Sequence, residues 1–249
     1  MKIEVAGENA LIVYLSAGGE ERGDLSEFSP RTLAKIQQLA RQLDQSMGPL
    51  LVDLVPSYAS LLVLFDASKT DHQSVEKMVR DDFSRLSSEQ DSSGKLVELP
   101  VFYGCAGGSE AGPDLGRVAA RAKLTPGQVV DIHKSREYRV YAIGFAPGFA
   151  YLGELDERIA TPRLETPRLQ VPAGAVAIAD RQTAVYPATS PGGWNLIGLC
   201  PVPMFHPEAL SREGLSAMPV AVGDRVRFRA IDKAEFLHLG GTLPGSTVV

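Results

Sequence analysis

The sequence is poor in cysteine and histidine, which removes the commonest ways of building a metal or disulfide site. Only two cysteines, Cys105 and Cys200, occur in 249 residues, too few for a disulfide framework. The four histidines are scattered, and no two of them stand at the i, i+4 spacing of a helical zinc motif. We therefore predict no metal site, and a reducing, cytoplasmic location is the natural expectation for so few cysteines.

Two further absences narrow the class of protein. No run of apolar residues approaches the roughly 20 that a membrane-spanning helix needs. The N-terminal sequence, MKIEVAGENALIVYL, lacks the charged segment and unbroken apolar core of a signal peptide. The formal net charge is -5, so there is no basic excess of the kind that binds nucleic acid. We expect a globular protein that binds neither nucleic acid nor membrane.

The first part of the chain, residues 1–87, predicts a small α+β domain. Apolar runs at 2–5, 10–15, 50–55 and 60–65 indicate four strands, the first two separated by Gly7-Glu8-Asn9. A helix is expected after Ser29-Pro30, a serine N-cap followed by proline. A second helix is expected from the capping box Thr70-x-x-Gln73. The order β-β-α-β-β-α favours an antiparallel sheet covered by two helices.

Residues 88–95 are polar and rich in serine, which predicts a linker. Residues 96–249 then predict a mainly β domain with two short helices. One helix is expected after Asp114, and the other after the capping box Thr125-x-x-Gln128. Many short strands, the last at 225–230, favour a closed barrel, because closure leaves no exposed sheet edges.

The most informative stretch runs from residue 144 to residue 203. It holds eight of the 17 prolines and the only tryptophan, Trp194. Helices do not tolerate that density of proline, so short strands joined by fixed turns are expected. Large rings among rigid turns, beside a few polar groups, are typical of a small-molecule site. The alternative stays open that glycine and proline here only turn the corners of a barrel.

Two arginines in this stretch are the strongest candidates for contact with an anion. Pro162-Arg163 and Pro167-Arg168 repeat at a spacing of five, and a guanidinium group binds carboxylate or phosphate through two parallel hydrogen bonds. We expect Arg168 to matter more, because it leads into the turn at 171–174.

Other motifs give weaker signals. The glycine-rich loop at 104–113 could approach phosphate, but it is not a P-loop, and a simple connector is an equal alternative. Ser74 and Lys77 match S-x-x-K, yet we expect both to face solvent on a helix. His133 is expected at the surface or at a helix end, although His133 with Glu137 could form a general-base pair. A single thiol, Cys105, is not a nucleophile without a base.

The segments EYRVYAIGFAPGFAYLG, TPRLETPRLQVPAGAVAIADRQTAVYP and SPGGWNLIGLCP resemble the KipI/allophanate hydrolase subunit 1 family. AGPDLGRVAA and VGDRVRF extend the resemblance over nearly the whole chain. The resemblance implies a cyclophilin-like β-barrel after the small α+β domain. Three positions depart from the usual pattern of the family: Ala175 replaces a serine, Asp180 a glycine and Cys200 a threonine.

The family resemblance also implies a function. It suggests one component of an ATP-dependent bacterial 5-oxoprolinase, which opens 5-oxo-L-proline to L-glutamate and is inactive without its other components. ATP is the expected cofactor, and it could bind this chain or a partner. The expected partners are a second cyclophilin-like protein and a third, barrel-type protein. Two alternatives stay open: a binding module that inhibits a histidine kinase, and a protein related to allophanate hydrolase or urea amidolyase.

Together, the residues and the resemblance yield one set of candidate site residues. The candidate catalytic residues are Arg168, Arg163, Gln182 and Tyr186. The candidate substrate-binding residues are Phe145, Pro147, Phe149, Tyr151, Pro172, Gly174, Gly192, Gly193 and Trp194.

Overall fold

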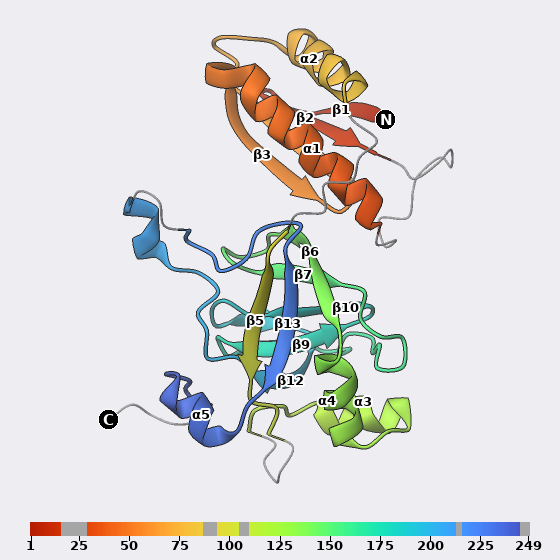
Figure 1. Cartoon of the computed structure of the whole chain (residues 1–249), viewed down its shortest axis with the longest axis vertical. Helices are drawn as coiled ribbons and strands as arrows, with labels where there is room; N and C mark the ends of the chain where they lie inside the picture. The colour runs from red at the N-terminus through yellow and green to blue at the C-terminus, as the bar shows by residue number, and fades with distance from the viewer. Residues whose placement is uncertain (16–28, 87–93, 105–109, 213–215, 245–249) are drawn as a thin grey trace. The chain divides into compact units, whose positions relative to one another are not determined.

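A computed structural model describes residues 1–15, 29–86, 94–104, 110–212 and 216–244 (Figure 1). The chain divides into two compact units, Met1–Ser93 and Gly94–Val249. Most of the expected linker, residues 88–95, lies outside the described residues, so the domain limits given above stay a prediction. No helix within the described ranges is long and apolar enough to cross a membrane.

The first unit follows the element order expected from its sequence. It consists of β1 (Lys2–Gly7), β2 (Ala10–Tyr14), α1 (Pro30–Met47), β3 (Leu51–Ser57), β4 (Ser60–Phe65) and α2 (His72–Ser84). The strands pair antiparallel in the order β1-β2-β4-β3. Alternate residues of the central strands, such as Val13 and Val63, are fully buried against apolar residues of both helices, such as Leu39 and Val79.

The helix starts of this unit test two capping predictions. Ser29 caps α1 as predicted, and its side chain accepts a hydrogen bond from Thr32 N with Pro30 in the first turn. The predicted capping box at Thr70 is wrong. Asp71 caps α2 instead, and its carboxylate accepts from Ser74 N at 2.8 Å. The carboxylate one residue further along thus takes the role that the pattern assigned to a hydroxyl.

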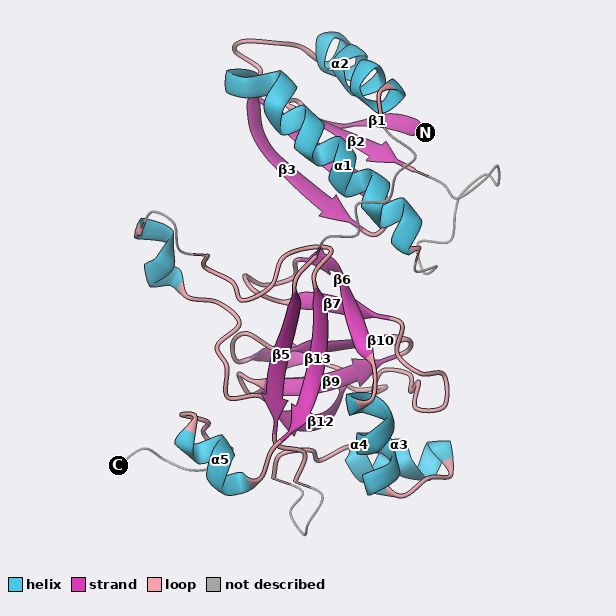
Figure 2. Cartoon of the chain, in the orientation of Figure 1, coloured by secondary structure: helices cyan, strands magenta, loops and turns pink. Residues whose placement is uncertain are grey.

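The second unit is built on a curved sheet of seven strands (Figure 2). The strands lie in the order β5-β13-β6-β7-β10-β9-β12, and only β13 and β5 run parallel to each other. A separate two-stranded sheet pairs β8 with β11. The strand bounds are β5 Leu96–Val101, β6 Glu137–Ile143, β7 Ala150–Gly153, β8 Arg168–Val171, β9 Ala175–Ala179, β10 Gln182–Val185, β11 Ser190–Gly192, β12 Asn195–Leu199 and β13 Arg225–Ala230.

The expected closed barrel is not what the structure has, because the strand ladder of the seven-stranded sheet stays open. Its two end strands, β5 and β12, are not paired along their lengths; within the described residues they are connected by a single bridge between Phe102, which follows β5, and Leu199 of β12. Asp114 occupies the edge of β12 instead: its N–H donates to Leu196 O, and its carboxylate accepts from Leu196 N. Backbone groups already bonded to Asp114 are not available to a neighbouring strand.

The two faces of the curved sheet carry different side chains because residues alternate along each strand. Val176 and Ile178 of β9 belong to the larger core, which includes residues of the helices α3 (Leu115–Ala122) and α4 (Pro126–Lys134). Ala175, Ala177 and Ala179 of the same strand belong to a second cluster, rich in aromatic residues. This second face carries the candidate site.

The helices of the second unit agree only partly with expectation. The capping box of Thr125 and Gln128 at α4 is confirmed, with both reciprocal hydrogen bonds present. Asp114 stands at the N-cap of α3, but its side chain makes no capping hydrogen bond. A further helix, α5 (Lys233–His238), was not foreseen, although Asp232 caps it by accepting from Glu235 N.

Candidate functional site

Phe149 lies at the centre of a cluster of aromatic rings. Its ring meets those of Tyr151, Tyr186, Trp194 and Phe145 at centroid distances of 4.9, 5.2, 5.7 and 5.3 Å, all in edge-to-face geometry. Edge-to-face pairs place the positive rim of one ring against the negative face of the next, which adds to the gain from burial. The structure thus brings together five of the residues that the sequence put forward.

Small side chains leave room for these rings. Ala177, Ala179 and Ala184, on adjacent strands β9 and β10, are fully buried in the same cluster as Phe149 and Trp194. Larger side chains at these positions would fill the space that the rings occupy. These three alanines therefore form the base of the aromatic cluster.

Two candidate glycines are needed for close contacts in the fold. A Cβ at Gly192 would lie 2.4 Å from the Tyr186 hydroxyl oxygen, so glycine lets β11 approach that phenol. Gly174 has φ of +80°, and its N–H and carbonyl bond to Tyr186 O and Cys200 N. Gly174 and the half-buried Pro172 therefore shape the turn between β8 and β9, and this turn is bonded to the backbone of Tyr186.

Burial changes the acidity of the tyrosines in the cluster. Burial raises the pKa of Tyr186 above its usual value, opposed by a backbone hydrogen bond from Trp194 and by the positive charge of Arg163. Burial likewise raises the pKa of Tyr151. Both phenols therefore stay protonated at neutral pH, and each keeps an O–H for donation.

Arg163 is exposed and lies over the indole of Trp194, with its guanidinium carbon 5.9 Å from the ring centroid. Among the described residues, no carboxylate comes within ion-pair distance of Arg163. A cation over an aromatic face is stabilised while its donors stay available to solvent. Arg163 is thus the accessible positive charge beside the aromatic cluster.

Arg168 stands in a different environment. Its Nη2 donates to Asp114 Oδ1 at 2.7 Å, and its side chain is 29% exposed. Its Nη1 is buried and has no hydrogen-bond partner within the part of the chain that is described. This geometry favours Arg163 over Arg168 for direct contact with an anion, although we expected Arg168 to matter more.

Three other candidates lie at the margins of the cluster. Phe145 is 67% exposed, and its backbone adopts φ of +71°, a conformation that glycine prefers. Pro147 is exposed in the same turn. Gln182 begins β10, four residues before Tyr186, so their backbones are separated by roughly 13 Å. The structure does not bring Gln182 next to Tyr186.

Two buried polar residues of this region escaped the sequence analysis as site residues. Asn195 is fully buried at the start of β12 and bonds the segment that carries Arg163. Asp114, expected only to cap a helix, connects Arg168 to β12. Their positions in the sequence could have pointed to them as site residues. Asn195 directly follows Trp194, and Asp114 lies in one of the segments that carry the family resemblance.

His133 is fully buried, so the expectation of a surface or capping role is wrong. Its Nδ1 lies 2.7 Å from the Tyr103 hydroxyl, and its Nε2 lies 2.9 Å from Thr183 Oγ1. Because Thr183 donates to Ala177 O, Nε2 carries the proton and Nδ1 accepts from Tyr103. Burial lowers the pKa of His133 to about 3.

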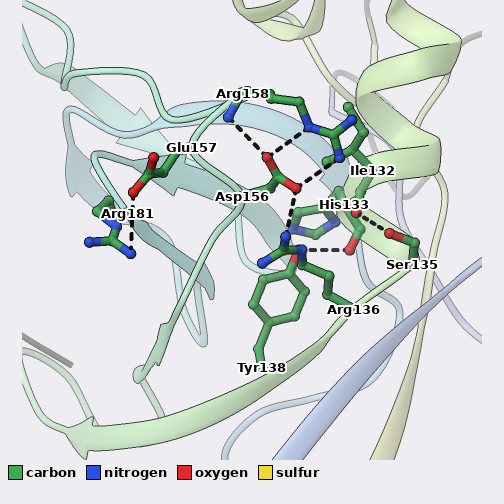
Figure 3. Close-up of polar contacts among 9 residues, drawn as sticks. All are labelled: Ile132, His133, Ser135, Arg136, Tyr138, Asp156, Glu157, Arg158 and Arg181. Carbon is green, nitrogen blue, oxygen red and sulfur yellow. Dashed lines mark hydrogen bonds and ion pairs between the residues drawn. The ribbon is translucent and has the colours of Figure 1, made fainter. Parts of the chain in front are cut away.

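The alternative of a base pair between His133 and Glu137 is also wrong. Glu137 forms ion pairs with Arg225 and Arg227 on the surface. The ring of His133 instead stacks on Phe228. Its backbone carbonyl accepts a hydrogen bond from the Tyr138 hydroxyl (Figure 3). The network belongs to the core, because the side chain of Thr183 lies on the sheet face opposite the aromatic cluster.

Asp156 anchors a second polar network near the end of α4 (Figure 3). Its carboxylate accepts from Arg158 at 3.0 and 2.9 Å, and it pairs with Arg136 at 2.9 Å. The hydrogen bonds from Arg158 lower the pKa of Asp156 well below its usual value. Asp156 is buried, while the side chains of both arginines are largely exposed. The network therefore connects the turn that holds Asp156 and Arg158 to Arg136 at the surface of the unit.

The remaining motifs give no site. Most of the glycine-rich loop, residues 105–109, lies outside the described residues, as does Cys105. Ser74 and Lys77 are exposed on α2, as expected. Burial raises the pKa of Cys200 to about 12, so its thiol is not a nucleophile at neutral pH. Within the described ranges, no three His, Cys, Asp or Glu side chains are grouped to hold a metal.

Residues 1–214 match the carboxyltransferase domain family, subdomains C and D. This chain belongs to that family. Two curated relatives, both B-type subunits of 5-oxoprolinase, extend the match. The one from Bacillus subtilis (strain 168) is 34% identical over 94% of this chain and 95% of its own length. The one from Escherichia coli O157:H7 is 40% identical over 84% of this chain and 92% of its own length.

A solved structure supports the same family assignment. The crystal structure of TTHA0988 is 34% identical to this chain and superposes with a TM-score of 0.72. The match covers 90% of this chain but only 40% of that longer chain. This carboxyltransferase-domain protein therefore shares the fold of part of a larger polypeptide.

Proposed function

We propose that this chain is the B-type subunit of an ATP-dependent 5-oxoprolinase, which hydrolyses 5-oxo-L-proline to L-glutamate with ATP cleavage. The observation that carries the proposal is the similarity to two B-type 5-oxoprolinase subunits over nearly their full lengths. The site supports a role within a complex, because the described part of the aromatic cluster holds no pair of nucleophile and base. The chain is inactive alone in this proposal.

The aromatic cluster forms the substrate-facing wall. The rings of Phe149, Tyr151 and Trp194 suit the apolar face of a small lactam ring. Arg163, which lies over Trp194, is positioned to pair with the carboxylate of the lactam or with phosphate. Phe145 and Pro147 complete the rim, and four residues in turns or at a strand end hold the wall in shape. These four are Pro172, Gly174, Gly192 and Gly193.

Opening a lactam requires activation of its carbonyl and stabilisation of the charge that develops on the oxygen. Tyr186 is suited to orient the amide, because its raised pKa keeps the phenol protonated and able to donate. Gln182, the first residue of β10, supplies a second polar group. Arg168, which is ion-paired with Asp114, adds a guanidinium group beside the aromatic cluster.

ATP enters the proposal as a co-substrate of the complex. The sequence has no P-loop, and Arg163 is the accessible cation of the described site, so we assign ATP binding to a surface completed by a partner. The partners are a second cyclophilin-like protein, of the allophanate hydrolase subunit 2 type, and a third, barrel-type protein. The second domain of this chain is itself of the cyclophilin-like class. The assembly is a cytoplasmic hetero-oligomer.

The direct test mixes the three purified proteins with ATP and 5-oxoproline and measures glutamate. The proposal predicts glutamate formation that needs all three proteins and ATP. The two partners must be shown to be active with a B-type 5-oxoprolinase subunit that is known to work. No glutamate with this chain, while those partners are active, would falsify the proposal and return attention to the kinase-inhibitor and allophanate alternatives.

A further inference from the structure

We propose that Asn195 is a positioning residue that holds the guanidinium group of Arg163 over Trp194. The inference deepens the proposed function and rests on it for the role of Arg163. Asn195 was not among the residues that the sequence pointed to, and it does not line the aromatic wall. It acts through the backbone of a neighbouring segment.

The hydrogen bonds of the Asn195 side chain define the role. Its Nδ2 donates to the carbonyls of Pro162 at 3.0 Å and Ile178 at 3.1 Å. Its Oδ1 accepts from Arg117 Nη1 of α3. A guanidinium group only donates, so the contact with Arg117 fixes the carbonyl end of the amide and turns the Nδ2 end toward Pro162. Helix α3, strand β9 and the arginine-bearing segment meet at this side chain.

The position of Asn195 in the chain allows it to control the distance between Arg163 and Trp194. Its backbone directly follows Trp194, and the residue that it holds, Pro162, directly precedes Arg163. One side chain therefore sets the distance between the two groups that form the cation–π contact of 5.9 Å. Proline fixes its own φ angle, which limits how far Arg163 can move when Pro162 is held.

Two backbone hydrogen bonds support the same segment from either side. Leu164 N donates to Gly193 O at 2.7 Å, and Asp180 N donates to Thr161 O at 2.8 Å. They hold the chain just before and just after Pro162-Arg163, but neither bonds a backbone group of those two residues. Among the described residues, the side chain of Asn195 donates the hydrogen bond that reaches the backbone of this dipeptide.

The critical variant is Asn195→Asp, because it removes the donor end of the side chain and keeps the oxygen that accepts from Arg117. The carboxylate still accepts from Arg117 but has no N–H to donate to the carbonyls of Pro162 and Ile178. We expect it to raise the KM of the reconstituted complex for 5-oxoproline about 2- to 10-fold, the effect of one net hydrogen bond, with kcat nearly unchanged. Asn195→Ala should have the same effect, whereas Arg117→Leu should change KM less.

A readout that needs no activity is available in the isolated chain. Trp194 is the only tryptophan, so its fluorescence reports on this site alone. We expect Asn195→Asp and Arg163→Ala to shift the emission spectrum in the same way. The matched control is Thr183→Val, which removes a fully buried polar group on the opposite face of the sheet. This control should lower stability and leave both the spectrum and the KM unchanged.

A double-mutant cycle decides between positioning and general stability. If Asn195 acts through Arg163, Asn195→Asp should have no further effect on KM or emission in an Arg163→Ala background. Additive effects would overturn the inference, as would an unchanged Trp194 spectrum in folded Asn195→Asp. An inactive wild-type complex would contradict the proposed function instead, and the fluorescence cycle would still test the link between Asn195 and Arg163.

Discussion

Arg168 and Asp114 form a hydrogen bond of 2.7 Å between Nη2 and Oδ1, and the same carboxylate accepts from Leu196 N at 2.7 Å through Oδ2. Asp114 therefore joins β8 to the edge of β12 with one buried carboxylate. Its two oxygens are both used, and its side chain is 9% exposed. Arg168 is bound into the fold, whereas Arg163 keeps its donors accessible.

Asp114→Asn should destabilise the chain by about 1.5–3 kcal/mol, because it removes the charged acceptor of a partly buried hydrogen bond. The amide oxygen still serves Leu196 N, so the fold should be retained. Urea unfolding of the isolated chain measures the change. Asp131→Asn is a suitable control, since Asp131 forms an exposed ion pair with Lys134 and should cost no more than about 1 kcal/mol. An equal loss in both variants would contradict the structural role of Asp114.

The variants Arg163→Lys and Arg168→Lys should differ in their effects on activity and on melting temperature. Lysine keeps the charge but loses the paired donors of the guanidinium group. For Arg163→Lys we expect unchanged melting temperature and a drop of about 10- to 150-fold in the activity of the complex, the effect of a lost charge-assisted bond. For Arg168→Lys the melting temperature should fall as well. Wild-type activity in both variants would assign the arginines to the fold alone.

The sequence predicted much of this site because the relevant signals are local. Proline density identified a region of turns and short strands, and the rings of Phe149, Tyr186 and Trp194 indeed meet there. The sequence ranked Arg168 above Arg163, whereas the geometry favours Arg163, because the difference depends on Asp114, which lies 54 positions away from Arg168 in the sequence. Contacts at that separation are set by the fold and leave no local pattern.

The same reason explains the largest error in the fold. A closed barrel was expected from the number of short strands, but the edge of β12 is bonded to Asp114. The burial of His133 was missed for a related reason: its partners, Tyr103 and Thr183, lie on separate strands or turns. Asp180, which departs from the glycine that the family resemblance implies at this position, has a φ of +49°, in the left-handed region that glycine adopts most readily.

His133 predicts a specific loss of stability in mild acid. Its pKa falls from 6.5 in the unfolded chain to about 3 in the fold, so the unfolded state binds the extra proton between those values. The contribution of His133 to stability is complete above pH 6.5 and declines as the pH falls through this window, by up to about 1.4 kcal/mol per pH unit. Urea unfolding from about pH 7 to about pH 4.5 measures the slope.

His133→Gln provides the comparison, since glutamine does not titrate. Its stability should be lower at neutral pH but should depend less on pH than that of the wild type. Asp156 also loses its contribution in acid, but only below about pH 4, because its pKa is lowered from 3.8. Parallel pH profiles for wild type and His133→Gln would show that His133 is not the buried neutral group of the structure.

The exposed rim of the aromatic cluster should contribute to assembly with the partner proteins. Trp194→Ala should weaken complex formation if this region lies at the contact, but Trp194 is 5% exposed, and its loss would also cost about 3–5 kcal/mol of stability. Phe145→Ala is a cleaner test, because Phe145 is 67% exposed. We expect weaker co-purification with little change in melting temperature. Leu210→Ala, another exposed apolar residue, is the control.

The most direct measurement adds this chain back to a mixture that lacks it. The two partner proteins, ATP and 5-oxoproline are held constant, and the release of glutamate and ADP is followed as the concentration of this chain increases. The account predicts that both products rise together and saturate at a fixed ratio of the three proteins. It also predicts that Arg163→Lys binds the partners equally well but reaches a rate lower by about 10- to 150-fold. Glutamate release that does not depend on the amount of this chain would contradict the account.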